Sequence, residues 1–191
     1  MSAALSMALA GCASDGRDLA EAQPWQTTPT SAPPQLEGVD GLTLSSPDFE
    51  PGDPAPLDQT CAGANRAPEL EWSNVPDDAV ELAITLSDQT DPTKPLLLWL
   101  VAGIDPSITS LDGAHLPDEL ATALNDYGQR GWGNPCIETL KEAVLDLQFK
   151  LHVLNAPSGI LDSDPGNEAW ATVAAGAVDS ATVLMRIDAA P

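Results

Sequence analysis

TCAGANRAPELEW, Thr60 to Trp72, is the stretch that decides the fold of this chain. Within it, Asn65 is typical of a turn and Pro68 of a rigid backbone, whereas Leu70 and Trp72 are typical of a buried core. Four other short motifs surround this stretch in a definite order and spacing: SSPDF at 45–49, SDQTDP at 87–92, LWL at 98–100 and GNPC at 133–136. The five motifs spread over most of the chain, so we interpret them together as one pattern.

The composition indicates a folded, strongly acidic domain. The chain has 191 residues, with 29 acidic and 7 basic side chains and a formal net charge of −22. This charge repels nucleic acid and anionic membrane surfaces, and we expect no nucleic-acid partner. The hydrophobic content of 43% is enough for a core, and the many glycines and prolines favour a loop-rich β protein over a helical bundle.

Short segments of alternating or continuous apolar residues predict a mainly β fold. Residues 147–154, LQFKLHVL, alternate in the manner of a half-buried strand, and residues 96–102, LLLWLVA, form a run suited to a buried central strand. We expect a helical turn over 117–124 and a helix over 167–175 with Asn167 as a candidate N-cap. The further expected strands are 42–44, 68–72, 80–86 and 181–187. This pattern favours a β-sandwich with one or two short peripheral helices.

The five motifs resemble those of the phosphatidylethanolamine-binding proteins, also called Raf-kinase-inhibitor-like proteins. The family pattern is approximately SPxF, TCDGxNxSPxLxW, DPDAP, HW, GPCPP and HxYxFxLYAL, and the resemblance covers about residues 42–187. It implies a large central antiparallel sheet with Greek-key connections and peripheral helices. We therefore place the folded domain at residues 41–190.

The resemblance also implies a small pocket that binds phosphate-like head groups through two histidines and an aspartate. The aspartate is retained as Asp88, but the histidine of HW is replaced by Leu98 and that of HxYxF by Leu145. Trp132 precedes the GNPC loop and is a candidate pocket wall, or alternatively an aromatic packed at the surface. The pocket positions implied by the family are Asp88, Thr90, Pro92, Leu98, Trp132, Pro135 and Leu145.

These substitutions change the chemistry that the pocket offers. Histidine supplies N–H groups to an anion and leucine supplies none, so we expect the pocket to reject phosphate. It would accept an apolar or cationic ligand, or be closed. For Asp88, a strand-end carboxylate that accepts backbone N–H groups is the interpretation we favour over a ligand contact.

The N-terminus predicts a lipoprotein of the bacterial cell envelope. Residues 1–12 end in LAGC, which matches a lipobox with Cys12 as the lipid-bearing cysteine. The segment lacks a basic leader region, which a start site placed too far downstream would explain. Residues 13–40 are rich in Pro, Ser, Thr and Ala and predict a tether, so membrane contact would pass through the lipid on Cys12.

The two other cysteines, Cys61 and Cys136, lie in loops that border the ligand site in the family. Export would place them in an oxidising compartment, and the resemblance therefore implies a disulfide between them. The alternative is two buried free thiols. With two histidines, no CxxC and no HxxxH, the sequence gives no sign of a metal site, and we expect no cofactor.

We expect a binding protein and not an enzyme. The sequence contains no GxSxG, HExxH or glycine-rich phosphate loop. The leading hypothesis is an envelope lipoprotein whose altered pocket binds a small ligand, a lipid head group or a protein partner. One alternative is a protease or kinase inhibitor acting through surface loops such as residues 105–125. A second is a hydrolase with an unconventional site.

Overall fold

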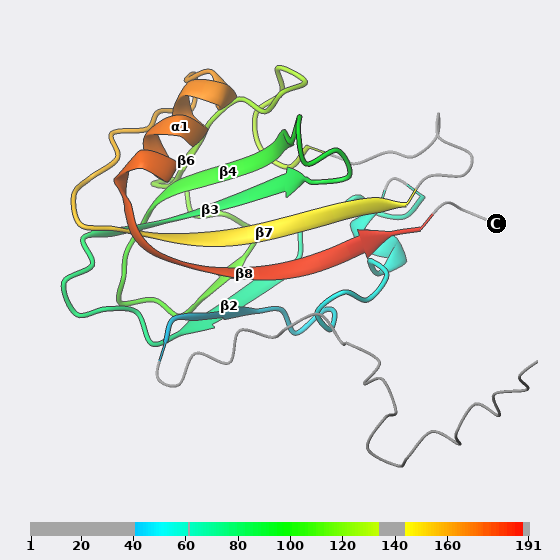
Figure 1. Cartoon of the computed structure of the whole chain (residues 1–191), viewed down its shortest axis with the longest axis horizontal. Helices are drawn as coiled ribbons and strands as arrows, with labels where there is room; N and C mark the ends of the chain where they lie inside the picture. Colours follow the sequence, from blue (N-terminus) through cyan, green and yellow to red (C-terminus); the bar gives the residue numbers. More distant parts are fainter. Residues whose placement is uncertain (1–40, 61, 134–143, 189–191) are drawn as a thin grey trace, which may run out of the picture. The chain divides into compact units, whose positions relative to one another are not determined.

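The computed structural model describes residues 41–60, 62–133 and 144–188. Within these ranges the chain forms two antiparallel sheets and one α-helix, which confirms the mainly β prediction (Figure 1). The helices are η1 (Leu57–Gln59, a 3₁₀ turn) and α1 (Gly166–Gly176). The strands are β1 (Thr43–Ser45), β2 (Glu69–Ser73), β3 (Glu81–Asp88), β4 (Leu96–Ile104), β5 (Ser110–Asp112), β6 (Ala121–Thr122), β7 (Leu145–Leu154) and β8 (Ala177–Ile187).

The larger sheet has the strand order β6-β4-β3-β7-β8, and the smaller has the order β1-β2-β5. The neighbours β7-β3-β4-β6 follow the order of a Greek key, in which the last strand returns to lie beside the first. Between β4 and β6 the chain crosses to the smaller sheet to form β5. The segment 105–125 therefore supplies an edge strand to each sheet.

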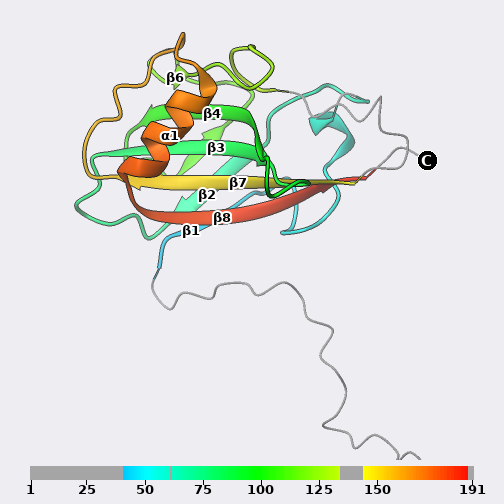
Figure 2. The ribbon, with the colours of Figure 1, turned by 45° about the horizontal axis from the view of Figure 1, so that its top comes forward.

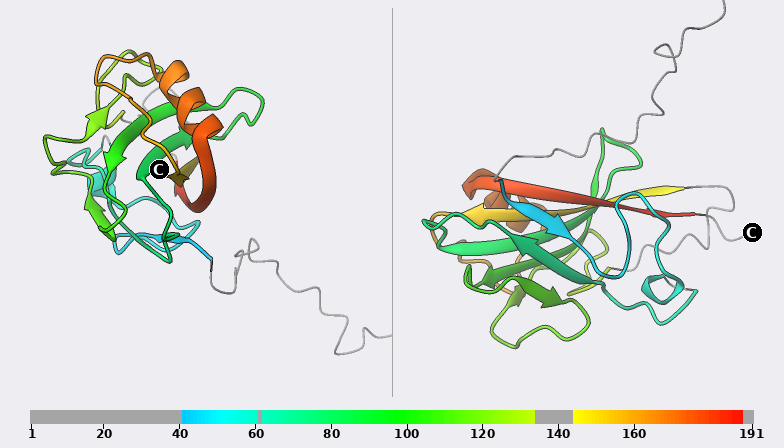
Figure 3. Two further views of the ribbon diagram at one scale, coloured as in Figure 1. Left: turned by 90° about the vertical axis from the view of Figure 1, so that its left-hand side faces the viewer. Right: turned by 90° about the horizontal axis from the view of Figure 1, so that it is seen from below.

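The main core lies between the two sheets. Alternate residues of β3, β7 and β8 point into it, because successive side chains of a strand face opposite sides. A smaller apolar cluster lies on the other face of the larger sheet, where α1 covers β4 (Figures 2 and 3). Its members include Leu97, Leu100, Ala169 and Val173. The larger sheet is thus covered on one side by the smaller sheet and on part of the other by α1.

Two local predictions were wrong. Residues 117–124 contain a turn, closed by a hydrogen bond from Leu120 N to Pro117 O, and then β6, because Ala121 and Thr122 pair with the edge of β4. The N-cap of α1 is Pro165 and not Asn167, so Asn167 lies in the first turn of the helix. Gly166 fits there because a Cβ atom would overlap the carbonyl oxygen of Leu124.

One buried carboxylate fixes the end of the larger sheet at which β3 begins and β4 ends. Glu81 is 8% exposed, and its Oε1 accepts hydrogen bonds from Gly103 N at 3.1 Å and Ser158 Oγ at 2.5 Å. Its Oε2 accepts a third from Ser158 N at 3.0 Å. Gly103 has a φ of +83°, which favours glycine. Glu81 therefore joins the end of β4 to the loop that precedes α1.

A buried histidine lies on the α1-facing side of the larger sheet. His152 of β7 is 2% exposed, and its Nε2 shares a 3.0 Å hydrogen bond with Thr85 Oγ1 of β3. Burial, with the charge of Lys150 as a smaller cause, lowers the pKa of His152 from 6.5 to about 4. The imidazole is therefore neutral in the folded protein at neutral pH.

This shift predicts a stability that falls as the pH is lowered. Between pH 6.5 and about 4 the unfolded chain binds a proton that the folded His152 does not, so acidification favours unfolding. From pH 7 to pH 4.5 we expect a loss of about 2–3 kcal/mol attributable to this residue. Denaturant titrations of the natural chain and of His152→Gln at both pH values measure it. An equal pH dependence in the two proteins would contradict the prediction.

Candidate ligand-binding site

The candidate site lies where β3 ends and β4 and β7 begin. Asp88, the last residue of β3, is opposite Leu96 of β4 and Leu147 of β7. Strand alternation places Asp88 on the same face as Leu86, which belongs to the main core. The structure thus brings the retained aspartate of the family pattern to the edge of the apolar core.

A β-bulge places Leu98 in the core at this end of the sheet. Leu86 pairs with Trp99 and Ser87 with Leu97, so Leu98 is the extra residue between them. Because of the bulge, Leu98 and Trp99 both belong to the main core, while Leu97 belongs to the cluster under α1. The bulge therefore directs the side chain at the position of the family histidine toward the candidate site.

The two leucines that replace histidines are both buried. Leu98 is 1% exposed and Leu145 is 7% exposed, and both are members of the main core cluster. They contribute apolar surface and no hydrogen-bond donor. The two positions therefore share one core, where both side chains act as packing groups.

Trp132 packs against the same cluster and is half-buried. Its ring stacks on Phe149 with centroids 6.2 Å apart and meets Trp99 edge to face at 5.6 Å. Its Nε1 donates a 3.1 Å hydrogen bond to Asn65 Oδ1. The next residue, Gly133, donates its N–H to Leu98 O at 2.9 Å, and a Cβ there would overlap that oxygen. Trp132 is thus a wall of the core at this end, fixed from both sides.

The residues around Asp88 form a hydrogen-bonded strand end. Asp88 Oδ1 accepts the N–H of Thr90 at 2.8 Å, and Thr90 Oγ1 accepts the N–H of Asp146 at 3.1 Å. This is the strand-end arrangement that the sequence analysis favoured for Asp88. Pro92 is exposed in the following turn. Asp88 and Thr90 therefore tie the loop after β3 to the start of β7.

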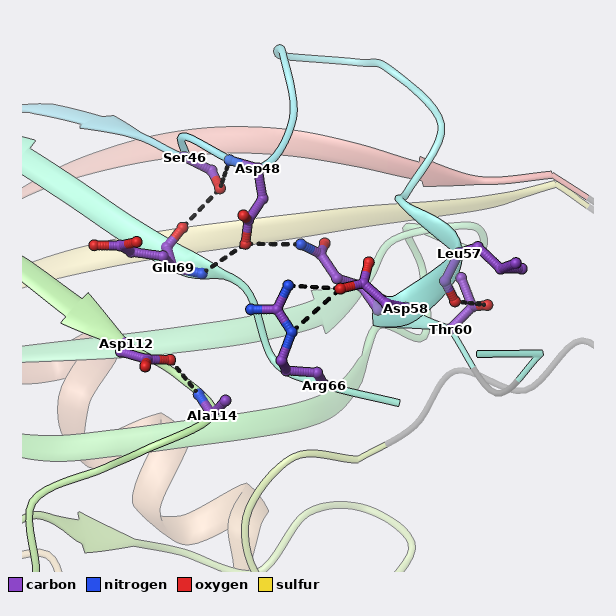
Figure 4. A network of polar contacts seen from close by, with 10 residues as sticks. Ser46, Asp48, Leu57, Asp58, Thr60, Arg66, Glu69, Asp112 and Ala114 are labelled. Carbon is purple, nitrogen blue, oxygen red and sulfur yellow. Dashed lines mark hydrogen bonds and ion pairs between the residues drawn. The ribbon is translucent and has the colours of Figure 1, made fainter. Parts of the chain in front are cut away.

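A polar network that the sequence analysis did not single out joins the SSPDF motif to the stretch 60–72 (Figure 4). Asp48 Oδ2 accepts hydrogen bonds from Gln59 Nε2 at 2.9 Å and from Glu69 N at 3.0 Å. Ser46 Oγ donates to Glu69 O at 2.6 Å. The motif SSPDF was the only available signal for Asp48, because its partners are 11 and 21 residues away in the sequence.

An ion pair closes the loop that contains Asn65. Arg66 donates from Nε and Nη2 to Asp58 Oδ2, at 3.2 and 2.6 Å (Figure 4). These hydrogen bonds hold the pKa of the Asp58 carboxyl below its usual value. Both side chains are exposed by more than a third, so we assign the pair a positioning role only. It supports the turn that presents Asn65 to Trp132.

Several predicted site residues lie outside the described residues. These are Pro135 of the implied pocket, Cys61 and Cys136 of the implied disulfide, and Cys12 of the lipobox. In residues 41–60, 62–133 and 144–188, no group of three or more His, Cys, Asp or Glu side chains is arranged to hold a metal ion. Across the same ranges, no helix is both long and apolar enough to span a membrane.

Comparison with known proteins gives a consistent family assignment. The family profile described as phosphatidylethanolamine-binding protein matches residues 45–185. "Putative lipoprotein LppC" of Mycobacterium tuberculosis is 35% identical over 135 residues, which are 70% of this chain and 67% of that protein. A UPF0098 protein of Methanothermobacter thermautotrophicus is 34% identical over 116 residues, which are 58% of this chain and 73% of that protein.

Two solved structures share the fold. The Escherichia coli protein YbcL, described as a member of the mammalian PEBP family, aligns with a TM-score of 0.69 at 24% identity and covers 77% of this chain and 98% of its own. The PEBP homologue CT736 of Chlamydia trachomatis aligns with a TM-score of 0.68 at 19% identity and covers 78% and 98%. At these identities the likeness supports the fold alone.

The contacts of Trp132 predict a graded loss of stability on substitution. We expect Trp132→Ala to lower the free energy of unfolding by about 2–3 kcal/mol, because a half-buried ring is removed from Trp99 and Phe149. Trp132→Phe retains the stacking and loses the hydrogen bond to Asn65, so we expect about 1 kcal/mol. Urea unfolding followed by circular dichroism measures both values. Equal losses for Ala and Phe would show that the stacking contributes nothing.

Proposed function

Because this chain belongs to the phosphatidylethanolamine-binding protein family, we propose that it is a non-enzymatic binding module of the cell envelope whose pocket no longer recognises phosphate. One observation supports this proposal most directly. The two positions at which the family pattern has histidine carry Leu98 and Leu145, and both leucines are buried in the main core. A phosphate group there would meet apolar surface and the Asp88 carboxylate.

The described end of the site favours a small apolar or cationic ligand. The half-buried ring of Trp132 offers an aromatic contact over the buried Leu98 and Leu145, and Asp88 lies at the edge of the same core. A carboxylate and the face of an aromatic ring each attract a positive group and repel an anion. The ligand class that fits is therefore an apolar molecule with a neutral or positively charged head.

The absence of catalysis is part of the proposal. The hydrogen-bond partners of the two histidines in the described residues are Thr85 for His152 and Asp112 for His115. Neither arrangement places a base beside a nucleophile and a pocket, which is the geometry that nucleophilic catalysis needs. The alternative of an inhibitor acts through segment 105–125 as a surface loop. This segment forms β5 and β6, which pair with the two sheets, and we therefore favour the pocket as the binding element.

The proposal predicts that phosphate head groups do not bind. In the chain labelled with ¹⁵N at its tryptophan indoles, we expect O-phosphoethanolamine to leave the Trp132 signal unmoved, with a Kd weaker than about 1 mM. Hexylammonium, an apolar body with a cationic head, should move that signal, and Asp88→Asn should weaken the effect. Micromolar binding of O-phosphoethanolamine by the natural chain would contradict the proposal.

A gain-of-function variant tests whether the two leucines are the reason that phosphate does not bind. Leu98→His combined with Leu145→His should bind O-phosphoethanolamine at least about tenfold more tightly, because a protonated imidazole adds a charge-assisted hydrogen bond to the phosphate. The matched control is Leu98→Asn with Leu145→Asn, which adds polarity but no cation. Thermal unfolding of all three proteins checks that the fold is retained.

We propose that the protein is anchored through Cys12 and carries a disulfide between Cys61 and Cys136. The name of the mycobacterial relative as a lipoprotein supports envelope anchoring. The hydrogen bond between Trp132 and Asn65 supports the disulfide, because it joins the two segments that lead to these cysteines.

The intact mass and the free-thiol count test both parts. In a bacterial host with a complete signal peptide, we expect a lipid-modified Cys12 and no free thiol in the natural chain. Cys12→Ala should lose the added mass and partition to the aqueous phase of a detergent extraction, with the thiol count unchanged. An unmodified chain with three free thiols would contradict the anchoring and the disulfide alike.

A further inference from the structure

A groove on the far side of the larger sheet is separate from the candidate site. It lies between α1 and the start of β4 and has a volume of about 290 Å³ (Figure 2 shows α1 over β4). Its lining residues are Pro95, Asp126, Asn167, Trp170, Ala171 and Ala174. The side chain of Leu97 belongs to the cluster under α1, whereas that of Leu98 belongs to the main core. The two sites therefore lie on opposite faces of β4.

The acidic side of the groove is held in place by the backbone. Asp126 Oδ2 accepts a hydrogen bond from Leu97 N at 2.7 Å, and Asp126 N donates to Leu97 O at 3.0 Å. The neighbouring Asn125 Oδ1 accepts from the N–H groups of Tyr127 and Gln129, both at 3.0 Å. In the described residues no hydrogen bond to Asp126 Oδ1 is present, and the residue is exposed. One carboxylate oxygen is therefore oriented by the loop and available to a ligand.

The opposite side of the groove is a fixed aromatic and apolar surface. Trp170 is half-buried on α1, and Ala171 and Ala174 leave space beside it. The start of α1 packs closely on the loop, because Gly166 approaches the Leu124 carbonyl too closely for a larger residue. The groove therefore exists without a rearrangement, and its volume is close to the lower end of that of small-molecule sites.

The groove combines three features that recognise a cation. An indole face attracts a positive charge, a carboxylate pairs with it, and no basic residue lines the groove. Each arginine of the described residues pairs with an aspartate, and the whole chain carries a formal net charge of −22. That charge raises the local concentration of cations.

We infer that the groove formed by Asp126, Asn167 and Trp170 is a second binding site, which takes a small organic ammonium ion with an aromatic or aliphatic body. The apolar part lies against Pro95 and the alanines of α1, and the ammonium lies between the indole of Trp170 and the Asp126 carboxylate. The carboxamide of Asn167 supplies a further acceptor.

Three probes with the same phenyl body and different heads test this inference: phenethylamine as the cation, 2-phenylethanol as the neutral analogue and 3-phenylpropionate as the anion. The readout is the ¹⁵N indole signal of Trp170 in the full chain at neutral pH. We expect phenethylamine to bind at least about threefold more tightly than the alcohol, and the anion to bind most weakly.

Substitutions separate this site from the candidate pocket. Asp126→Asn retains an acceptor for Leu97 N and should weaken phenethylamine about three- to tenfold while leaving the alcohol unchanged. The matched control is Asp105→Asn, which removes the same charge from a carboxylate that accepts Ser107 N at 2.8 Å near the other end of β4. Asp88→Asn should leave the Trp170 response unaltered, so failure of the pocket proposal would not affect this one.

Three outcomes would overturn the inference. The first is that the Trp170 signal does not move with phenethylamine up to about 10 mM. The second is that the alcohol or the anion binds as tightly as the amine. The third is that Asp126→Asn and Asp105→Asn weaken the amine equally, which would show general attraction to an acidic surface.

Discussion

The register of β3 between β4 and β7 is the constraint on which the rest of the structure depends. β3 pairs with β7 from Glu81 to Asp88 without a shift, and this pairing sends Leu82, Ile84 and Leu86 into the main core. A shift of one residue would turn all three toward the α1 side of the sheet, where the small or polar side chains of Ala83, Thr85 and Ser87 are buried now. The same register places Asp88 at the core edge and buries the Glu81 carboxylate at the opposite end of the strand.

The bulge at Leu98 in β4 directs neighbouring side chains to opposite faces of the sheet. Leu97 and Leu98 are neighbours in sequence. The backbone N–H of Leu97 donates to Asp126 Oδ2 beside α1, whereas the side chain of Leu98 packs in the main core. Without the extra residue, Leu98 could not share a face with Trp99. One local irregularity therefore shapes both the candidate pocket and the groove beside α1.

The charged side chains form a few ion pairs on a surface that is acidic overall. The arginines of the described residues form ion pairs, for example Arg66 with Asp58 and Arg130 with Asp162. These pairs order loops, and they leave the acidic surface without compensation. This acidic surface and the leucines at both family histidine positions are the two grounds on which we propose a cationic or neutral ligand.

The sequence by itself determined the family, the mainly β class and most strand positions, because alternation and short motifs are local signals. β7 was predicted from the alternation within residues 147–154, and Leu98 and Leu145 were identified from the match of short motifs to the family pattern. Only the tertiary structure decided the bulge at Leu98, the strand at 121–122 in place of a helical turn, and the cap of α1. It also decided the partners of Trp132, Glu81 and Asp126, because these contacts join residues between 22 and 77 positions apart. No local pattern encodes such distances, and the packing of the two sheets and α1 sets them.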